Sequence, residues 1–350
     1  MTTIVASYNV TPNQPTPMEP LWLSDSDLVG YLGHVSTIYI YKAKHSGDII
    51  ETMKNSLSKI LVPYYPIAGR LRLTESGRME VDCNAKGVTL IEAETTNTFG
   101  DYKDFSPSES TKELVPEVDY TQPMQELPLL LLQLTKFHGG EGLAIGVLVS
   151  HPLADGIAIA HFINIWAKLA RGETPESNEL PFLDRKLLKL PHQSAPSVDL
   201  PEWKPVPKMP GIGIEQNKRS CALLTLTSSQ VEKLKKMANN QSMKEGARPY
   251  STFEVISAHI WRCASKARVT IKLTLGQKQL DYISSFFNGQ GQQHKGVPYS
   301  GSHNILLTSW INMPVYEVDF GWRKPVHFGI ADVSQEDRAM ITRSSDGDVL

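Results

Sequence analysis

The spacing of apolar residues changes abruptly near the middle of the chain. Leu143 to Val149 is a short, continuously apolar run, which is typical of a buried strand. It ends at Ser150-His151-Pro152, and from Gly156 to Arg171 apolar residues recur at helical spacing. The pattern predicts a buried strand, a tight turn and an amphipathic helix, in that order.

Similar patterns predict the elements that precede this stretch. Alternating β-branched and aromatic residues indicate a strand at Ser36–Tyr41, and helical spacing indicates a helix from Ile49 to Leu61, before Pro63. Residues 101–125 are polar, contain proline and are expected to be irregular. Further strands are expected at Arg78–Cys83, Gly87–Glu94 and Leu129–Phe137, the last joined to the central strand by a hairpin turn at 139–142.

The second half of the chain has weaker patterns. Residues 172–210 are rich in proline and lack periodicity, so they are the best candidate for a crossover between domains. Ser251 and Glu254 have capping-box spacing at the start of a helix; its N-terminus could bind an anion, but an ordinary cap is the favoured interpretation. The remaining expected elements are strands at Cys221–Leu226 and Asn304–Pro314, a helix at Ser228–Met237 and an extended segment at Val315–Trp322.

Composition narrows the class of protein. The chain has 350 residues, 41% of them hydrophobic, which suits one large domain or two of ordinary size. With 21% charged residues and a formal net charge of -2, we expect neither nucleic acid nor an anionic membrane as a partner. We find no secretory signal and no run long enough to span a membrane, so we expect a cytoplasmic protein.

Cysteine and histidine spacing bears on redox state and metal binding. Cys83, Cys221 and Cys263 are far apart and odd in number, which predicts buried thiols in a reducing compartment and no disulfide frame. The histidines show no ligand spacing, so no metal is expected.

His151 and Asp155 are the candidate catalytic pair. A bare His-x-x-x-Asp spacing is a weak signal, and a buried histidine satisfied by hydrogen bonds is the commoner finding. The strand-to-helix junction and the small residues Ala154 and Gly156 in the turn favour the catalytic interpretation. Imidazole titrates at roughly pH 6.5, so it can accept and return a proton at cellular pH. Asp155 is expected to hold the turn and orient the ring, and a role as a second base is the alternative.

The sequence contains no recognisable nucleophile motif. There is no Gly-x-Ser-x-Gly, and the cysteines lie away from His151. We therefore expect the histidine to activate an acceptor directly, without a covalent enzyme intermediate.

Five short motifs follow one another over most of the chain. His151-Pro152-Leu153-Ala154-Asp155-Gly156 has the form His-x-x-x-Asp-Gly, and Asp319-Phe320-Gly321-Trp322 begins a second motif, Asp-Phe-Gly-Trp-Gly. The other three are Tyr65–Arg70, Tyr250–Glu254 and Thr308–Trp310. In their order along the chain, the five motifs together resemble those of the plant BAHD acyltransferases. The N-terminal third and the residues of the first motif are most similar to those of the hydroxycinnamoyl transferases, particularly those that use spermidine.

The resemblance implies an α/β (α+β) fold with two chloramphenicol-acetyltransferase-like domains, mixed sheets flanked by helices. We expect an N-terminal domain at 1–180, a crossover linker at 181–215 and a shortened C-terminal domain at 216–350. An acyl-CoA, expected to be hydroxycinnamoyl-CoA, enters a channel between the domains from one face, and the acceptor enters from the other. The implied partners are these small molecules alone: no bound cofactor is expected, and the protein is expected to be a monomer.

The resemblance also assigns roles to residues. His151 takes the proton of the acceptor, which attacks the thioester carbonyl, and then returns a proton to the CoA thiolate. Thr308 or Trp310 lies near the oxyanion, which needs positioned donors. Asp319 is a third catalytic candidate, although its counterpart in the family usually pairs with an arginine away from the substrate. The acyl-CoA side is implied to comprise Ser251, Thr252, Phe253, Glu254, Thr308, Ser309 and Trp310.

The chain departs from the family pattern at three places, and the shortened middle and tail motivate an alternative, a catalytically inactive truncated homologue. Arg323 stands where the family has the final glycine of the second motif, which a side chain tolerates only if the backbone does not need positive φ. The stretch between Arg268 and Thr308 is shorter than in relatives and lacks a recognisable arginine-bearing strand. The chain also ends without the family's final strand and helix, which exposes apolar surface and strand edges.

The acceptor is inferred from two positions. Relatives that use shikimate have a threonine at the position of Val35 and an arginine in the loop that corresponds to 289–296, where this chain has Lys295. Because lysine does not replace a bidentate arginine, an amine such as spermidine is the favoured acceptor. Transfer to the hydroxyl of shikimate or quinate is the nearest alternative. A condensation domain shares the first motif, but the second motif and the absence of a carrier-protein neighbour argue against it.

Overall fold

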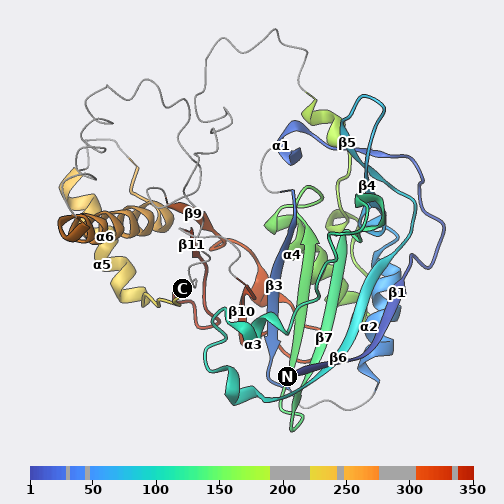
Figure 1. Cartoon of the computed structure of the whole chain (residues 1–350), viewed down its shortest axis with the longest axis horizontal. Helices are drawn as coiled ribbons and strands as arrows, with labels where there is room; N and C mark the ends of the chain where they lie inside the picture. Colours follow the sequence, from blue (N-terminus) through green and yellow to red (C-terminus); the bar gives the residue numbers. More distant parts are fainter. Residues whose placement is uncertain (29–31, 44–47, 190–220, 243–247, 276–304, 333–337) are drawn as a thin grey trace. The chain divides into compact units, whose positions relative to one another are not determined.

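The computed structural model describes residues 1–28, 32–43, 48–189, 221–242, 248–275, 305–332 and 338–350 (Figure 1). Contacts divide the chain into two compact units. The first comprises Met1–Pro191 and Asn312–Val333, and the second comprises His192–Ile311 and Ser334–Leu350. Residues 312–333 thus belong to the first unit although they follow most of the second, which the predicted boundaries do not anticipate.

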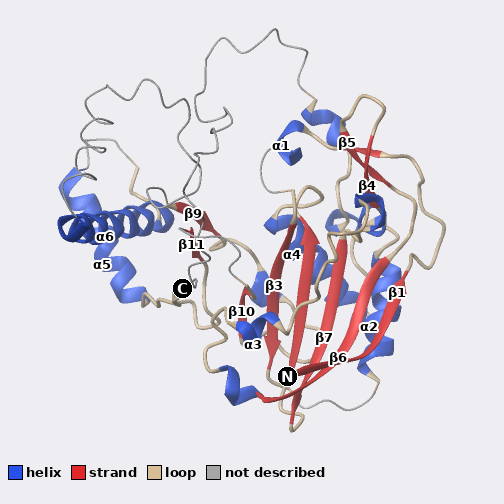
Figure 2. Cartoon of the chain, in the orientation of Figure 1, coloured by secondary structure: helices blue, strands red, loops and turns tan. Residues whose placement is uncertain are grey.

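A six-stranded mixed sheet forms the centre of the first unit (Figures 1 and 2). The β6–β7 pair is parallel, and the other pairs are antiparallel. Every residue of β8 is buried, which explains its unbroken apolar run. The strand order is β1 (Thr2–Val10), β6 (Val88–Thr98), β7 (Leu130–His138), β8 (Leu143–Ser150), β3 (His34–Tyr41) and β10 (His327–Ile330).

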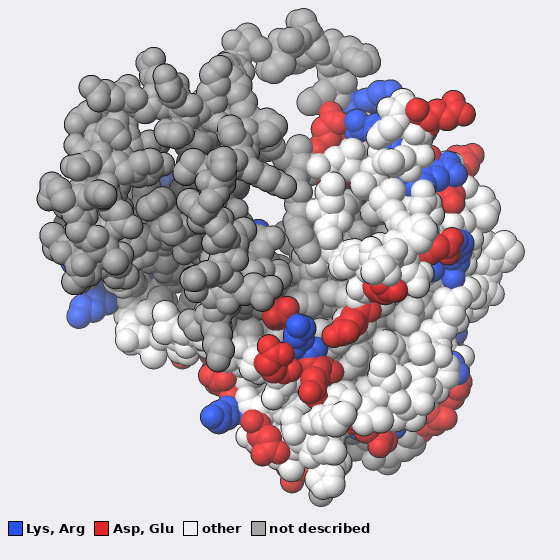
Figure 3. Space-filling view, in the orientation of Figure 1, with Lys and Arg blue, Asp and Glu red and all other residues white. Residues whose placement is uncertain are grey.

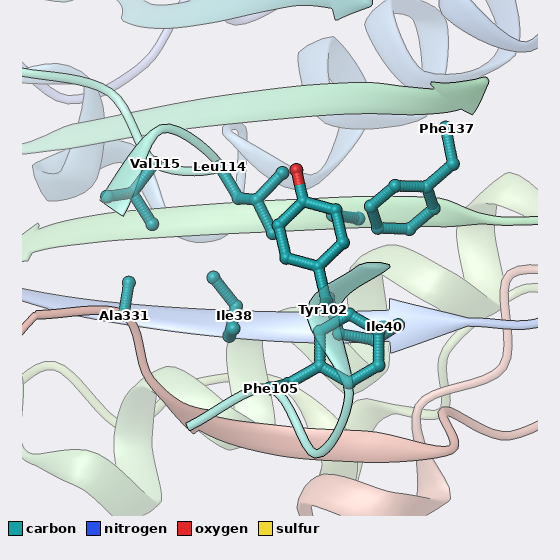
Figure 4. Close-up of a cluster of buried hydrophobic side chains, with 9 residues drawn as sticks. Ile38, Ile40, Tyr102, Phe105, Leu114, Val115, Phe137 and Ala331 are labelled. Atoms are coloured by element: carbon teal, nitrogen blue, oxygen red, sulfur yellow. The ribbon is translucent and has the colours of Figure 1, made fainter. Parts of the chain in front are cut away.

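One face of this sheet is covered by the segment expected to be irregular. It contains three short helices, η2 (Phe99–Tyr102), α3 (Glu109–Lys112) and η3 (Met124–Glu126). Figure 4 shows its apolar side chains packed on the alternate residues Ile38 and Ile40 of β3. A Cβ at Gly146 of β8 would lie 2.1 Å from the Leu114 carbonyl oxygen, so the segment passes closely over the sheet only because that residue is glycine.

Two helices, α2 (Ile49–Ile60) and α4 (Gly156–Ala170), pack against each other on the opposite face (Figure 2). The side chain of Asp48 caps α2 by accepting from the Glu51 N–H at 3.2 Å. Trp166 of α4 is fully buried and donates its indole N–H to Ser56 Oγ of α2 at 3.0 Å. The amphipathic pattern of both segments thus corresponds to burial against the sheet and against each other.

A smaller antiparallel sheet and several short turns complete the first unit. The sheet has the order β2 (Leu21–Trp22), β5 (Met79–Asp82) and β4 (Arg70–Leu73). The short helices are α1 (Asp25–Leu28), η1 (Tyr65–Ala68), η4 (Ser177–Glu179), η5 (Arg185–Leu188) and η7 (Val315–Glu317).

The second unit contains a helix pair and a two-stranded sheet. Helix α5 (Ser228–Ser242) packs with α6 (Thr252–Leu275), and β9 (Leu306–Ser309) pairs in parallel with β11 (Arg338–Ile341). A small apolar cluster joins these elements and the tail: Val231, Ile256, Ile311, Ile341 and Val349.

Most of the expected long elements are confirmed, and the differences have local causes. The strand expected at Cys221–Leu226 is wrong: only Leu226 pairs, in a single bridge with Val349. The segment Val315–Trp322 begins with the turn η7 instead of running extended, and the strand expected at Asn304–Pro314 is limited to β9 within its described part. Strand β1 was not predicted, although burial alternates along its second half from Ala6 to Val10; five of its nine residues are exposed, so the pattern is weak.

The cysteine prediction is correct for only one residue. Cys83 is buried, whereas Cys221 and Cys263 are exposed, and all three are free thiols. Cys263 is exposed because it lies on the solvent side of α6, and Cys221 because it lies in an irregular segment.

Charged side chains of both signs are mixed on the visible surface (Figure 3). On the face shown in Figure 3, lysine and arginine side chains are interspersed with aspartate and glutamate over the visible described surface. Among the helices in the described ranges, none is both long and apolar enough to cross a bilayer.

Candidate active site

His151 is the first residue after the central strand β8. Its main-chain N–H donates to the Gly33 carbonyl oxygen at 3.0 Å, and the Leu153 N–H donates to the Ser150 carbonyl oxygen at 3.0 Å. Pro152 and Leu153 are buried, while the imidazole of His151 is exposed and makes no hydrogen bond with any other residue in the described ranges. A strand paired on both sides thus holds the main chain of the turn and leaves the ring to the solvent.

Asp155 is the N-cap of α4. Its Oδ1 accepts from the Ala158 N–H at 2.8 Å, with φ -78° and ψ 176° at the cap. A carboxylate here satisfies a free N–H of the first turn and lies at the positive end of the helix dipole. The predicted holding of the turn is confirmed, whereas no hydrogen bond joins Asp155 to the His151 ring.

Arg185 contacts the same turn, and the sequence reasoning missed it. One guanidinium nitrogen lies 3.5 Å from the Pro152 carbonyl oxygen, and another donates to the Leu153 carbonyl oxygen. The guanidinium also forms an ion pair with Asp27 Oδ2 at 3.0 Å. In the sequence, Arg185 is an isolated arginine that begins the short helix η5 after α4, and such a position does not indicate a contact.

The start of β3 lies beside the turn. His34 pairs with Ser150 and Val35 with Val149 in the β3–β8 register. The His34 ring is fixed by the Tyr120 hydroxyl and the Pro128 carbonyl oxygen, each at 2.9 Å. Burial lowers the pKa of His34, although the hydrogen bond to the Pro128 carbonyl opposes this effect. His34 is therefore a neutral structural neighbour of the site at pH 7.

Asp319 lies at the other end of α4. Its Oδ1 accepts from the Gly321 N–H at 2.7 Å, and its main-chain oxygen accepts from the guanidinium of Arg171, the C-cap of α4. Helix α4 has 15 residues and so spans about 22 Å at 1.5 Å per residue. The structure therefore does not bring Asp319 close to His151.

The residues after Asp319 form an aromatic anchor. The ring centroid of Phe320 lies 4.9 Å from that of Trp166 and 6.2 Å from that of Tyr41. Trp322 stacks on Phe320 at 5.3 Å, and the Tyr41 hydroxyl donates to the Val318 carbonyl oxygen at 3.3 Å. The second motif thus ties this returning segment to β3 and α4.

Arg323 has φ +72°, in the left-handed region that favours glycine. The glycine of the family motif is therefore replaced where the backbone needs positive φ. The side chain is exposed, so it can be accommodated sterically, but the backbone conformation is strained.

In the second unit, Ser251 and Glu254 form the predicted capping box of α6. The Glu254 N–H donates to Ser251 Oγ at 3.2 Å, and the Ser251 N–H donates to Glu254 Oε2 at 2.7 Å. Arg248 binds both carboxylate oxygens, at 2.9 and 2.7 Å, and this pairing is the main reason that the pKa of Glu254 falls to about 2. Thr252 and Phe253 begin the helix. The carboxylate of Glu254 therefore already occupies the end that could bind an anion.

Thr308, Ser309 and Trp310 lie at the end of β9. Thr308 and Ser309 are exposed, and Ser309 Oγ accepts from the Ile311 N–H at 3.5 Å. The Trp310 N–H donates to the Ile341 carbonyl oxygen at 2.7 Å. Their placement beside an oxyanion stays a prediction. The loop 289–296, including Lys295, lies outside the described residues.

Solved structures share the fold. The crystal structure of vinorine synthase matches with a TM-score of 0.69 and 19% identity, covering 100% of this chain and 93% of that one. The structure of F. graminearum TRI101 in complex with coenzyme A and T-2 mycotoxin matches with a TM-score of 0.69 and 12% identity, covering 95% and 94%. The predicted α/β fold is confirmed.

Curated relatives are more similar in sequence. A hydroxycinnamoyl-CoA:piscidic acid hydroxycinnamoyltransferase of Actaea racemosa is 33% identical, over 99% of this chain and 94% of that protein. A shikimate O-hydroxycinnamoyltransferase of Nicotiana tabacum is 30% identical over 98% and 93%. A hydroxycinnamoyl-CoA:5-hydroxyanthranilate N-hydroxycinnamoyltransferase of Avena sativa is 31% identical over 99% and 94%.

The alignments also contain positions at which this chain has no residue. The match to the Actaea protein extends over 425 aligned positions, of which 99% of this 350-residue chain fills about 347, so about 78 positions have no residue here. The model of the Transferase family matches residues 1–283 and 274–349 as two separate pieces, which overlap at 274–283. This agrees with the shortening expected between Arg268 and Thr308.

The family model matches nearly the whole chain, and the curated relatives agree with it. Members of this family that resemble the chain take an acyl-CoA as co-substrate and transfer its acyl group to an acceptor. The chain therefore belongs to the Transferase family of BAHD acyltransferases, and it is related to the hydroxycinnamoyl-CoA transferases.

Proposed function

We propose that this chain transfers a hydroxycinnamoyl group from its CoA thioester to an amine of a polyamine such as spermidine, with His151 as the general base. The observation that carries the proposal is the exposed imidazole at the end of a fully paired strand, on a turn whose main chain is fixed from both sides. A base must be held in place yet free to exchange a proton with its substrate, and the fixed main chain and exposed ring of His151 support this role.

The proposed reaction proceeds without a covalent enzyme intermediate. A neutral nitrogen of His151 accepts a proton from the acceptor as the acceptor nitrogen attacks the thioester carbonyl carbon. A C–N bond forms, and the carbonyl oxygen carries the negative charge until the C–S bond breaks. The imidazolium then gives its proton to the departing CoA thiolate. Thr308 and Trp310 are the proposed oxyanion neighbours, and Ser251–Glu254 with Ser309 are proposed on the acyl-CoA side.

Two points support an amine acceptor. Val35 lies opposite Val149, two residues before His151, so the side chain at this position has no hydroxyl to bind a shikimate oxygen. One relative, from Avena sativa, is named as an N-acylating enzyme. An alkyl amine titrates at roughly pH 10, so one proton must first leave to the solvent, and His151 takes the second proton as the neutral amine attacks. A cytoplasmic monomer is part of the same proposal.

The acceptor test compares spermidine, shikimate and quinate with p-coumaroyl-CoA as the donor. We expect an amide product with spermidine and release of one CoA thiol per transfer. His151→Ala should lower kcat by about 10²- to 10⁴-fold without a change in thermal melting. His138→Ala, at the exposed end of β7, is the matched control and should keep full activity. A product with shikimate alone would reject the amine proposal.

A second candidate is an inactive homologue, favoured by the roughly 78 aligned positions that this chain lacks. It predicts no turnover with any acceptor, whether or not the chain binds p-coumaroyl-CoA. If the thioester raises the melting temperature of a cooperative transition, the chain still binds its acyl donor, because a ligand that binds the folded state stabilises it. Turnover would exclude the inactive homologue altogether.

A further inference from the structure

Arg185 joins three segments of the first unit that are distant in the sequence. It belongs to η5, its guanidinium reaches the carbonyl oxygens of Pro152 and Leu153, and it pairs with Asp27 of α1. The side chains of Arg185 and Asp27 are only 20% and 24% exposed. The contact therefore lies mostly out of the solvent, where a fixed geometry has more effect than at the surface.

The rest of the turn is held through its N–H groups and not through these carbonyls. The N–H of His151 donates to β3, the N–H of Leu153 donates to Ser150, and Asp155 caps the helix. In the described ranges, Arg185 is the donor for the carbonyls of the two residues that directly follow His151. Loss of the guanidinium would leave these acceptors unpaired and release one side of the turn.

Asp27 is itself fixed before it meets the arginine. Its Oδ2 accepts from the Ser24 N–H at 2.7 Å and from Ser24 Oγ at 2.8 Å, and Ser24 is buried. The carboxylate therefore balances the guanidinium charge and orients its plane toward the turn. A planar fork can serve a carboxylate and two carbonyls at once, which a lysine ammonium on a flexible stem does poorly.

We infer that Arg185, oriented by Asp27, is a positioning residue that fixes the main chain of the turn carrying His151. It touches neither substrate nor reacting atoms. The consequence for catalysis rests on the proposed role of His151. A displacement of about 1 Å in a catalytic group can cost about 100-fold in rate, so the clamp should act on kcat and leave acyl-CoA binding almost unchanged.

The test uses the full chain and the variants Arg185→Gln, Arg185→Lys and Asp27→Asn. Arg72→Gln is the matched control, because Arg72 also forms partly buried ion pairs, with Glu80 and Asp82, but these pairs join strands of the small sheet and do not involve the turn. We expect kcat to fall about 10- to 100-fold in Arg185→Gln, with KM for p-coumaroyl-CoA within twofold, and partial recovery in Arg185→Lys. Arg72→Gln should keep kcat within twofold.

Amide hydrogen exchange supplies a readout that does not depend on activity. In Arg185→Gln and Asp27→Asn, the peptide covering 150–156 should exchange at least tenfold faster, whereas the peptide covering β6 should be unchanged. This arm separates failure of the clamp from failure of the proposed function, because it can be measured even if the wild-type chain shows no turnover. Unchanged exchange at 150–156 in both variants, or a kcat in Arg185→Gln within twofold of wild type, would overturn the inference.

Discussion

The motif His151–Gly156 lies at the N-terminal end of α4 and the motif Asp319–Trp322 lies beside its C-terminal end, and the two motifs differ in exposure and in how they are held. At the N-terminal end, His151 and Asp155 are exposed and are held by main-chain hydrogen bonds and a helix cap. At the C-terminal end, Phe320 is 4% exposed and packs between aromatic side chains, and Asp319 binds the N–H of its own turn.

This difference suggests that the first motif serves catalysis and that the second motif serves stability. A group that exchanges protons must reach its substrate, and the first motif leaves its imidazole accessible. The second motif instead buries aromatic area and fastens β10 and the segment before it to the sheet. We therefore expect substitutions at the first end to act on rate and those at the second end to act on stability.

The largest effect on stability is expected from Phe320→Ala. Removing a buried phenylalanine from its contacts with Trp166 and Tyr41 should lower the free energy of unfolding by about 3–5 kcal/mol, measured by urea denaturation. Phe182→Ala is the control, because Phe182 is 76% exposed, and should change this free energy by less than about 0.5 kcal/mol. A loss of kcat without loss of stability in Phe320→Ala would place the second motif in the active site.

Acid should also lower the free energy of unfolding, through His327 of β10, the strand that follows the second motif. Burial lowers the pKa of His327 to about 4, and the carboxylate of Asp104 opposes this shift only in part. The unfolded chain therefore binds a proton more readily than the folded one below roughly pH 6.5. Stability is complete above that pH and falls by roughly 2–3 kcal/mol as the pH drops toward 4.

The variant His327→Phe tests this pH dependence. It keeps an aromatic ring beside Phe105, whose centroid lies 5.5 Å from that of His327, and removes the titrating group. The slope of unfolding free energy against pH between 6.5 and 4 should become shallower, while His138→Gln should keep the wild-type slope. An unchanged slope in His327→Phe would assign the acid sensitivity to other groups, such as the half-buried His34.

At the first end, substitutions of Asp155 distinguish a cap from a charge. Asp155→Ala should lose about 1 kcal/mol of stability and much of the activity, because the Ala158 N–H loses its acceptor and the turn loosens. Asp155→Asn and Asp155→Ser still offer a cap oxygen and should retain most of both. If Asn preserved stability but lost as much kcat as Ala, the carboxylate charge would belong to the chemistry.

The sequence was sufficient for the parts of the site that are local. The strand, turn and helix around His151 follow from two adjacent periodicities, and the capping box of α6 follows from residues three apart. Arg185 and β10 could not be predicted, because each acts through a partner far away in the sequence and carries no periodic pattern of its own. Short strands and lone ion pairs depend on tertiary contact, which spacing does not encode.

The smallest expected effect is a gain at Arg323. A left-handed backbone conformation destabilises a non-glycine residue by about 1–2 kcal/mol. Replacement by glycine removes this strain but increases the entropy of the unfolded chain, which offsets about 0.5–1 kcal/mol of the gain. With φ +72° and an exposed side chain, Arg323→Gly should therefore raise the free energy of unfolding by roughly 0.5–1 kcal/mol and leave kcat unchanged. Glu75→Gly, at an exposed turn residue without positive φ, should lower it instead. Arg323 belongs to the segment beside the C-terminal end of α4, where substitutions are expected to change stability and not kcat. A change in kcat in Arg323→Gly would show that the two ends of α4 are coupled and would contradict this expectation.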